Sequence, residues 1–121
     1  MITLSAHMRI LVAVEPVDFR AGIDGLVRLC RQRLEVDPFC GTLFVFTNRR
    51  RTAIKILTYD GSGFWLCHKR LSSDRFRYWP QSGEHCAPCV LQAHELQVLL
   101  MGGDPAAAKG APVWRPLPMA A

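Results

Sequence analysis

The fold is decided by one continuous stretch, TLFVFTNRRRTAIKILTYDGSGFWLCHKR, which covers residues 42–70. Its apolar, β-branched and aromatic residues form short runs that are typical of strands. The segment Asp60-Gly-Ser-Gly63 separates two of these runs, and its glycines supply the positive φ that a tight hairpin turn needs. Together with one further run before Pro80, the pattern predicts an antiparallel meander of about four strands, at 42–47, 53–59, 64–70 and 75–79.

Upstream of this stretch, the sequence indicates a strand followed by a helix. The run at 9–14 is short, apolar and β-branched, as expected of a mostly buried strand. Asp18 is a suitable helix N-cap, and Asp37-Pro38 ends the element because the residue before proline avoids the α region. The expected apolar face of the helix recurs at helical spacing and consists of Ile23, Leu26, Val27, Cys30 and Leu34.

Downstream, the residues 90–101 have the pattern of an amphipathic helix that ends at Gly102-Gly103, and a short strand is expected near 84–87. The fold class is therefore α+β, with an N-terminal strand and helix, the meander, and a C-terminal helix packed on the sheet. We expect a single domain at 1–103 and a tail at 104–121 that is rich in Pro, Ala and Gly.

Positive charge is concentrated in the middle of the chain. The formal net charge of the whole chain is +5, whereas residues 48–77 alone hold eight basic and two acidic residues, a net of +6. A basic segment between neutral flanks favours a polyanion as partner, although a charge run is also common on an ordinary solvated face. The candidate nucleic-acid-binding residues are Arg49, Arg50, Arg51, Lys55, Lys69, Arg70, Arg75 and Arg77.

The simplest hairpin registers would align Lys55, His68 and Arg77 across three strands and pair Arg70 with Arg75. They also place aromatic and apolar side chains on the same face, namely Tyr59, Phe64, Leu66 and Trp79. Cations that hold phosphates beside rings that stack on bases are typical of a nucleic-acid surface. The alternative is that the end of this face that carries these aromatic and apolar side chains, the aromatic end, belongs to the core and is covered by the C-terminal helix. Arg49–Arg51 lie at a turn in either case.

The cysteines form a second candidate site. Cys86 and Cys89 stand in a C-x-x-C pair near His85 and His94, which is the spacing of a tetrahedral zinc site, but a second such pair is absent from the sequence. We therefore expect no metal and no cofactor. The number of cysteines is odd and the N-terminus does not resemble an export signal, so reduced thiols and a cytoplasmic location are expected.

Enzyme motifs are missing. The sequence contains no phosphate-binding glycine loop, no G-x-S-x-G elbow and no H-E-x-x-H motif. The aspartates stand mainly at cap and turn positions, where aspartate is common in any protein. A carboxylate cluster for metal-dependent phosphoryl chemistry is the remaining enzymatic alternative. We expect a protein that is not an enzyme, that does not insert into a membrane, and whose sequence carries no signal of an oligomeric state.

Nearly the whole chain resembles the TnpB-type second-reading-frame (Orf2-like) proteins of the insertion sequence 66 family. The cysteines at 86 and 89 are not expected in that family. The matching segments, in order along the chain, are Met1-Ile-x-Leu-x-Ala-x-x-Arg9-Ile10, Asp18-Phe-Arg20-x-Gly22-x-Asp24-Gly25-Leu26, Asp37-Pro-Phe-x-Gly41-x-Leu-Phe-Val-Phe46, Ile54-Lys-Ile-Leu57, Tyr59-Asp-Gly-x-Gly63, Lys69-Arg-Leu71, Arg75-Phe76, Trp79-Pro80, Leu96–Met101 and Trp114-Arg115-Pro116.

The resemblance implies an accessory protein of a bacterial mobile element, encoded beside a separate transposase that carries the catalytic acids. It transfers no catalytic residue to this chain. The function expected first is binding of DNA at the element ends, or of a transposase–DNA complex, through Arg49–Arg51 and the basic strands. The second expectation is a module that docks on the transposase without contacting DNA. A metal-dependent nuclease is the third.

Overall fold

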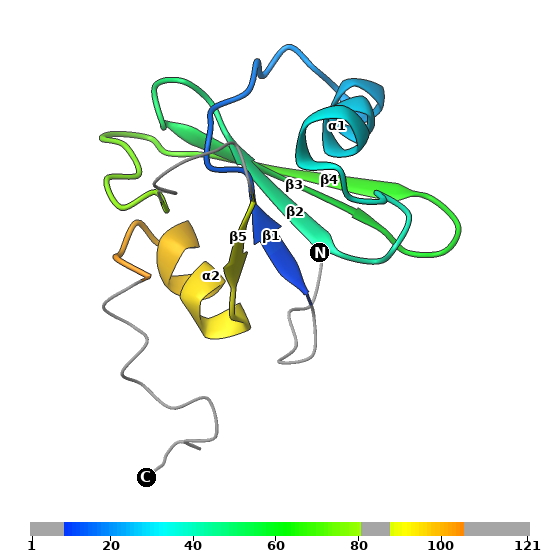
Figure 1. The fold of residues 1–121 in the computed structure, drawn as a ribbon. Helices are drawn as coiled ribbons and strands as arrows, with labels where there is room; N and C mark the ends of the chain where they lie inside the picture. The colour runs from blue at the N-terminus through cyan, green and yellow to red at the C-terminus, as the bar shows by residue number, and fades with distance from the viewer. Residues whose placement is uncertain (1–8, 81–87, 106–121) are drawn as a thin grey trace, which may run out of the picture.

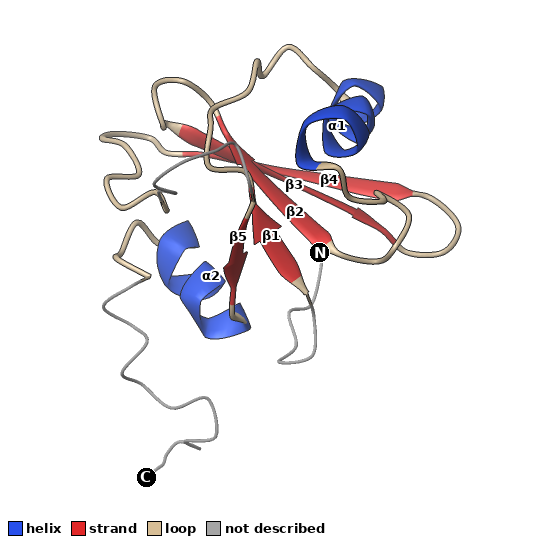
Figure 2. Ribbon diagram, viewed as in Figure 1, coloured by secondary structure: helices blue, strands red, loops and turns tan. Residues whose placement is uncertain are grey.

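The computed structural model describes residues 9–80 and 88–105, which form a twisted five-stranded sheet with one helix on each face (Figures 1 and 2). The strand order is β4-β3-β2-β1-β5. This arrangement confirms the α+β class. The elements are β1 (Ile10–Val12), α1 (Ile23–Leu29) continued by the π-helical turn η1 (Cys30–Leu34), β2 (Leu43–Thr47), β3 (Ala53–Tyr59), β4 (Phe64–Arg70), β5 (Cys89–Leu91) and α2 (Ala93–Leu100).

The predicted meander exists as the three antiparallel strands β2, β3 and β4. The β3–β4 register pairs Tyr59 with Phe64 and Lys55 with His68, so the alignment expected across this hairpin is confirmed. β1 joins the other side of β2 in the parallel direction, and β5 pairs antiparallel with β1. The sheet is therefore mostly antiparallel, with one parallel pair at its centre.

Alternate residues of the central strands feed two separate cores. Leu43 and Val45 of β2 face α2, whose Leu96 and Leu99 are fully buried against them. Phe44 and Phe46 of the same strand face α1 and η1. All five residues of β2 are buried because both of its faces are covered. The expected packing of the C-terminal helix on the sheet is confirmed.

The N-terminal helix begins later than predicted. Asp18 was expected to be its N-cap, but α1 begins at Ile23 and Gly22 occupies the N-cap position. The Asp18 carboxylate instead accepts a hydrogen bond from the backbone N–H of Arg20 at 2.9 Å, and this contact closes a local turn. Such side-chain-to-backbone bonding two residues along the chain competes with helix formation. The helical segment ends before Glu35, whose φ of 56° is left-handed, rather than at Asp37-Pro38.

The strand predicted at 75–79 is not formed. Phe76 and Trp79 are both buried in the core under α2, and residues three apart in a strand would point to opposite faces. The segment is a loop held by two long-range hydrogen bonds, from Phe76 N–H to the carbonyl of Arg51 and from Trp79 Nε1 to the carbonyl of Ala13. The predicted alignment of Arg77 with Lys55 and His68 is therefore wrong, and so is the pairing of Arg70 with Arg75.

The aromatic face also differs from the prediction. Phe64 and Leu66 pack on the α1 side of the sheet, whereas Trp79 packs on the α2 side. The aromatic end is thus partly core, as the alternative stated, but the helix on that side is the N-terminal one. Tyr59 and Phe64 contact each other and Phe39, with ring centres 4.9–5.2 Å apart.

At the C-terminal end, the predicted helix at 90–101 is shorter in the structure. Residues 89–91 form β5, and α2 begins at Ala93 behind a capping box made by Gln92 and Glu95. The strand expected at 84–87 and the tail beyond 105 fall outside the described residues. The division into a domain at 1–103 and a tail therefore stays a prediction.

Replacement of Phe76 by alanine tests the role of the 75–79 loop. The side chain is fully buried, so Phe76→Ala should lower the free energy of unfolding by about 3–5 kcal/mol. Tyr78→Ala is the matched control, because that neighbouring ring is 49% exposed and its removal should change stability by less than about 0.5 kcal/mol. Urea denaturation measures both. Equal effects of the two variants would contradict the loop conformation.

Candidate nucleic-acid interface

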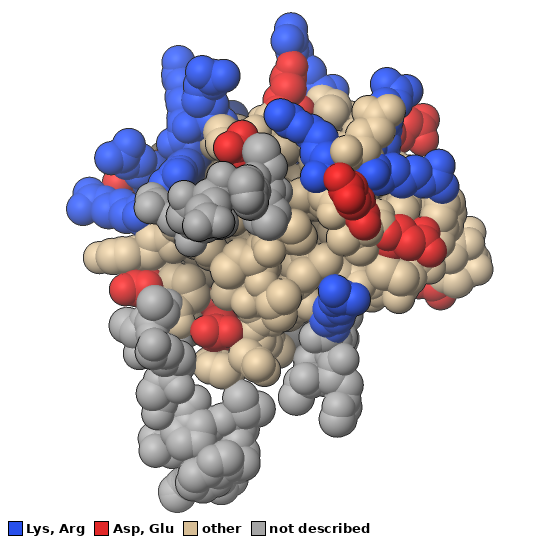
Figure 3. Space-filling view, viewed as in Figure 1, with Lys and Arg blue, Asp and Glu red and all other residues tan. Residues whose placement is uncertain are grey.

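Three loops that are distant in sequence meet at one end of the sheet. The first is 13–22, the second is the β2–β3 turn at 48–52, and the third is 71–79. The N–H of Val17 donates to the carbonyl of Thr47 at 2.9 Å, and the N–H of Phe76 donates to the carbonyl of Arg51 at 2.7 Å. These bonds tie the first and third loops to opposite sides of the turn. In Figure 3, basic side chains lie over this end of the molecule and also over α1, and few lie beside α2.

The β2–β3 turn is fixed by the side chain of Asn48. Its Oδ1 accepts hydrogen bonds from the N–H groups of Thr52 and Ala53, and its Nδ2 donates to the hydroxyl of Thr52. The N–H of Arg51 donates to the carbonyl of Asn48 at 3.0 Å, and the φ of Arg51 is 58°. Left-handed backbone at a non-glycine residue costs roughly 1–3 kcal/mol, so the surrounding bonds must hold it. The turn is therefore a rigid support for exposed arginines.

A hollow of about 490 Å³ lies between this turn and the third loop. Among the arginines that line it, only Arg77 has an ion pair within the described part of the chain, with Asp74 at 3.1 Å. The hollow thus gathers strong positive charge with one carboxylate at its rim. Its lining residues are Arg49, Arg50, Arg51, Arg75, Phe76 and Arg77.

The structure also brings Arg20 to this end, although the sequence analysis did not select it. Its side chain is 91% exposed, and its guanidinium pairs with the carboxylate of Asp18 at 2.8 Å. The hydrogen bonds from Arg20 lower the pKa of Asp18 to about 2. Charge counting missed Arg20 because residues 1–47 are neutral overall. A signal was available in the order of elements, since the loop after β1 lies beside the turn after β2 when the two strands run parallel.

Lys55 lies inside the fold. It is 7% exposed, and its ammonium donates to the carbonyls of Phe19 and Ala21 at 2.9 and 3.0 Å. The same ammonium lies 4.9 Å from the centre of the Phe19 ring. Lys55 therefore anchors the first loop to β3, and its buried ammonium is not part of the exposed basic surface.

Lys69 and Arg70 end the edge strand β4 and are both exposed. The ammonium of Lys69 donates to the carbonyl of Leu100 in the last turn of α2, where a positive charge favours the helix dipole. Arg70 pairs in register with Ala53, so it lies at the same end of the sheet as the β2–β3 turn. Of these two candidates, Arg70 lies nearer along the chain to the hollow between the turn and the third loop, because it is the last residue of β4 and the third loop follows it directly.

The cysteine candidates give no assembled site in the described part. His85 and Cys86 fall outside the described residues, and no group of three metal-binding side chains occurs within 9–80 and 88–105. Burial raises the pKa of Cys89 above its usual range. Burial also raises the pKa of the core thiol of Cys30 to about 12, which keeps it unreactive at neutral pH.

The helices in the described ranges are too short to span a bilayer.

Lys55→Met tests the anchoring role. The substitution keeps an unbranched side chain but leaves two carbonyls without their donor, so we expect a decrease of about 1–3 kcal/mol in unfolding free energy. Arg70→Met is the control, because it removes a positive charge from the exposed end of the neighbouring strand. Urea titration compares the two. The anchoring role is contradicted if Lys55→Met unfolds at the same urea concentration as the unmodified chain.

Comparison with known proteins gives the family. Residues 8–110 match the family model described as IS66 Orf2-like protein. Protein y4jC of Sinorhizobium fredii is 39% identical over 122 residues, which cover 99% of this chain and 100% of that protein. Protein y4hO of the same organism is 35% identical, covering 86% of this chain and 88% of that protein. No solved structure matches the chain. The chain therefore belongs to the IS66 Orf2-like family of transposition accessory proteins.

Proposed function

We propose that this accessory protein binds DNA during transposition of its element, as a binding protein and not as an enzyme. The surface involved is the arginine end, defined as Arg49, Arg50, Arg51, Arg70, Arg75 and Arg77. The observation that carries the proposal is the hydrogen bond between Phe76 N–H and the carbonyl of Arg51, which joins two arginine-bearing loops around one hollow.

The chemistry of the arginine end suits phosphate. A guanidinium offers planar, bidentate donors that match phosphate oxygens, and it stays charged at any physiological pH. Arginines held close together repel one another, and this repulsion is relieved when a polyanion neutralises them. Because hydrogen bonds already hold the backbone of the β2–β3 turn, binding costs little backbone entropy there, and the entropy lost is mainly that of the arginine side chains.

The family supports a nucleic-acid partner, because DNA is the substrate of transposition. Contacts from arginine to backbone phosphates carry little sequence information, so the proposal concerns affinity and positioning and not base recognition. Transposase at the element ends would supply specificity in such an assembly.

A second candidate function, docking on the transposase, is favoured by the opposite end of the sheet. There, Trp65 is 51% exposed on the edge strand β4, and Phe39 is 44% exposed in the loop before β2. Exposed aromatic rings are enriched at protein interfaces. This function predicts that transposase and accessory protein co-purify after nuclease treatment, and that Trp65→Ala prevents this while arginine substitutions do not.

The double variant Arg49→Ala/Arg50→Ala tests DNA binding. Affinity for a duplex from the element end, and for each of its separated strands, is measured by fluorescence anisotropy over a salt series. Removal of one arginine that neutralises a phosphate should reduce the slope of log affinity against log salt by about 0.7–0.9, so the slope of the double variant should fall by up to about 1.8.

The control is Arg28→Ala/Arg33→Ala, which removes the same charge from exposed positions on the helical segment. It should lower affinity much less than the variant in the turn. Equal decreases in affinity in the two variants would show that net charge alone matters, and the arginine end would then have no special role. Absence of binding to both duplex and single strands at low salt would refute the proposed function.

A further inference from the structure

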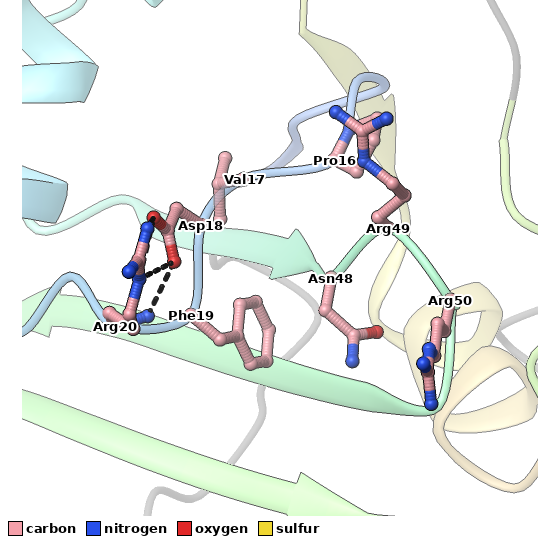
Figure 4. Close-up of a pocket in the computed structure, with 8 residues that line it drawn as sticks. All are labelled: Pro16, Val17, Asp18, Phe19, Arg20, Asn48, Arg49 and Arg50. Carbon is pink, nitrogen blue, oxygen red and sulfur yellow. Dashed lines mark hydrogen bonds and ion pairs between the residues drawn. The ribbon is translucent and has the colours of Figure 1, made fainter.

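A second hollow, of about 430 Å³, lies on the other side of the β2–β3 turn. It shares Arg49 and Arg50 with the first hollow, so the two are adjacent along the arginine end. Figure 4 shows the ring of Phe19 between the Asp18–Arg20 pair and Asn48. The residues that line it are Pro16, Val17, Asp18, Phe19, Arg20, Asn48, Arg49 and Arg50.

The Phe19 ring is held in place from the side of the sheet. Lys55 donates to the carbonyl of the same residue, and its ammonium lies 4.9 Å from the centre of the ring. The His68 ring meets Phe19 edge-to-face, with ring centres 5.6 Å apart. The N–H of Val17 fixes the middle of the loop on the carbonyl of Thr47. The ring therefore borders the hollow as a partly exposed and preorganised aromatic surface.

Charge is distributed unequally around this hollow. On one rim, Arg49 and Arg50 are exposed and have no ion pair within the described residues. On the other rim, the Asp18 carboxylate offsets the charge of Arg20. A phosphate is therefore attracted mainly to the rim formed by the turn, while the ring of Phe19 lies beside it.

We propose that this hollow accepts one unpaired nucleobase of single-stranded DNA, stacked on Phe19, with the neighbouring phosphates on Arg49 and Arg50. The proposal rests on the DNA binding proposed above and specifies single-stranded DNA as the form that is bound. In a duplex, the faces of the bases are occupied by their neighbours, whereas a single strand presents them to aromatic side chains. Because Arg49 and Arg50 of the β2–β3 turn line both hollows, the same DNA strand continues from this hollow toward Arg75 and Arg77 in the other.

The test compares three labelled probes by anisotropy: an oligothymidylate strand, the same strand with abasic residues at its centre, and a duplex. The abasic strand keeps the phosphates and lacks the bases. Stacking of one base should make the unmodified protein bind the thymidylate strand roughly 5- to 100-fold more tightly than the abasic strand. Phe19→Leu should abolish this difference and leave duplex affinity within about twofold, and Phe19→Tyr should preserve it.

Phe39→Leu is the matched control, since it makes the same change at an exposed ring at the opposite end of the sheet. If Phe19→Leu fails to fold, photo-crosslinking of a 5-iodouracil strand to the unmodified protein decides, because the crosslinked peptide should contain Phe19. An unchanged preference for the thymidylate strand in Phe19→Leu, or crosslinks elsewhere only, overturns the proposal while DNA binding stands. Failure to bind any of the three probes refutes the proposed function as well.

Discussion

Because β1 and β2 run parallel, their carboxyl ends lie at the same end of the sheet. The loop that leads to α1 therefore begins beside the turn that follows β2. β4 runs antiparallel to β3 and ends at that same end, so the third loop also starts there. These two strand directions together gather residues from three separated segments onto one surface. With an antiparallel β1, the loop that carries Phe19 and Arg20 would lie at the opposite end.

The arginine end is assembled against two local costs. Of the three non-glycine residues with positive φ in the described part, Arg51 and Asp74 both belong to loops of this end. The arginines of this end also repel one another, since only Arg77 among them has an ion pair within the described ranges. Other contacts offset these costs. The side chain of Asn48 accepts hydrogen bonds from two backbone N–H groups of the turn, and Phe76 and Trp79 anchor the third loop in the core. Strain that persists at one site is often connected with binding there.

The hairpin of β3 and β4 was predictable to the residue, because the glycine-rich turn at 60–63 fixes its register. The loop at 75–79 was mistaken for a strand because it alternates charged and aromatic residues. Its conformation depends on burial of Phe76 and Trp79 in a core formed by distant elements. The burial of Lys55 was equally invisible, since its partners are backbone carbonyls more than thirty positions away. The sequence pattern thus predicts where the basic loops lie, but not the contacts that hold them together.

The basic end of β4 has a consequence for how copies of the chain behave toward one another. In the described part, β4 forms one edge of the sheet and carries exposed Lys69 and Arg70. An unpaired edge is a template on which another strand can extend the sheet, and positive charge on such an edge is a common protection. The charge that favours a polyanion therefore also discourages the pairing of this edge with the edge of a second copy.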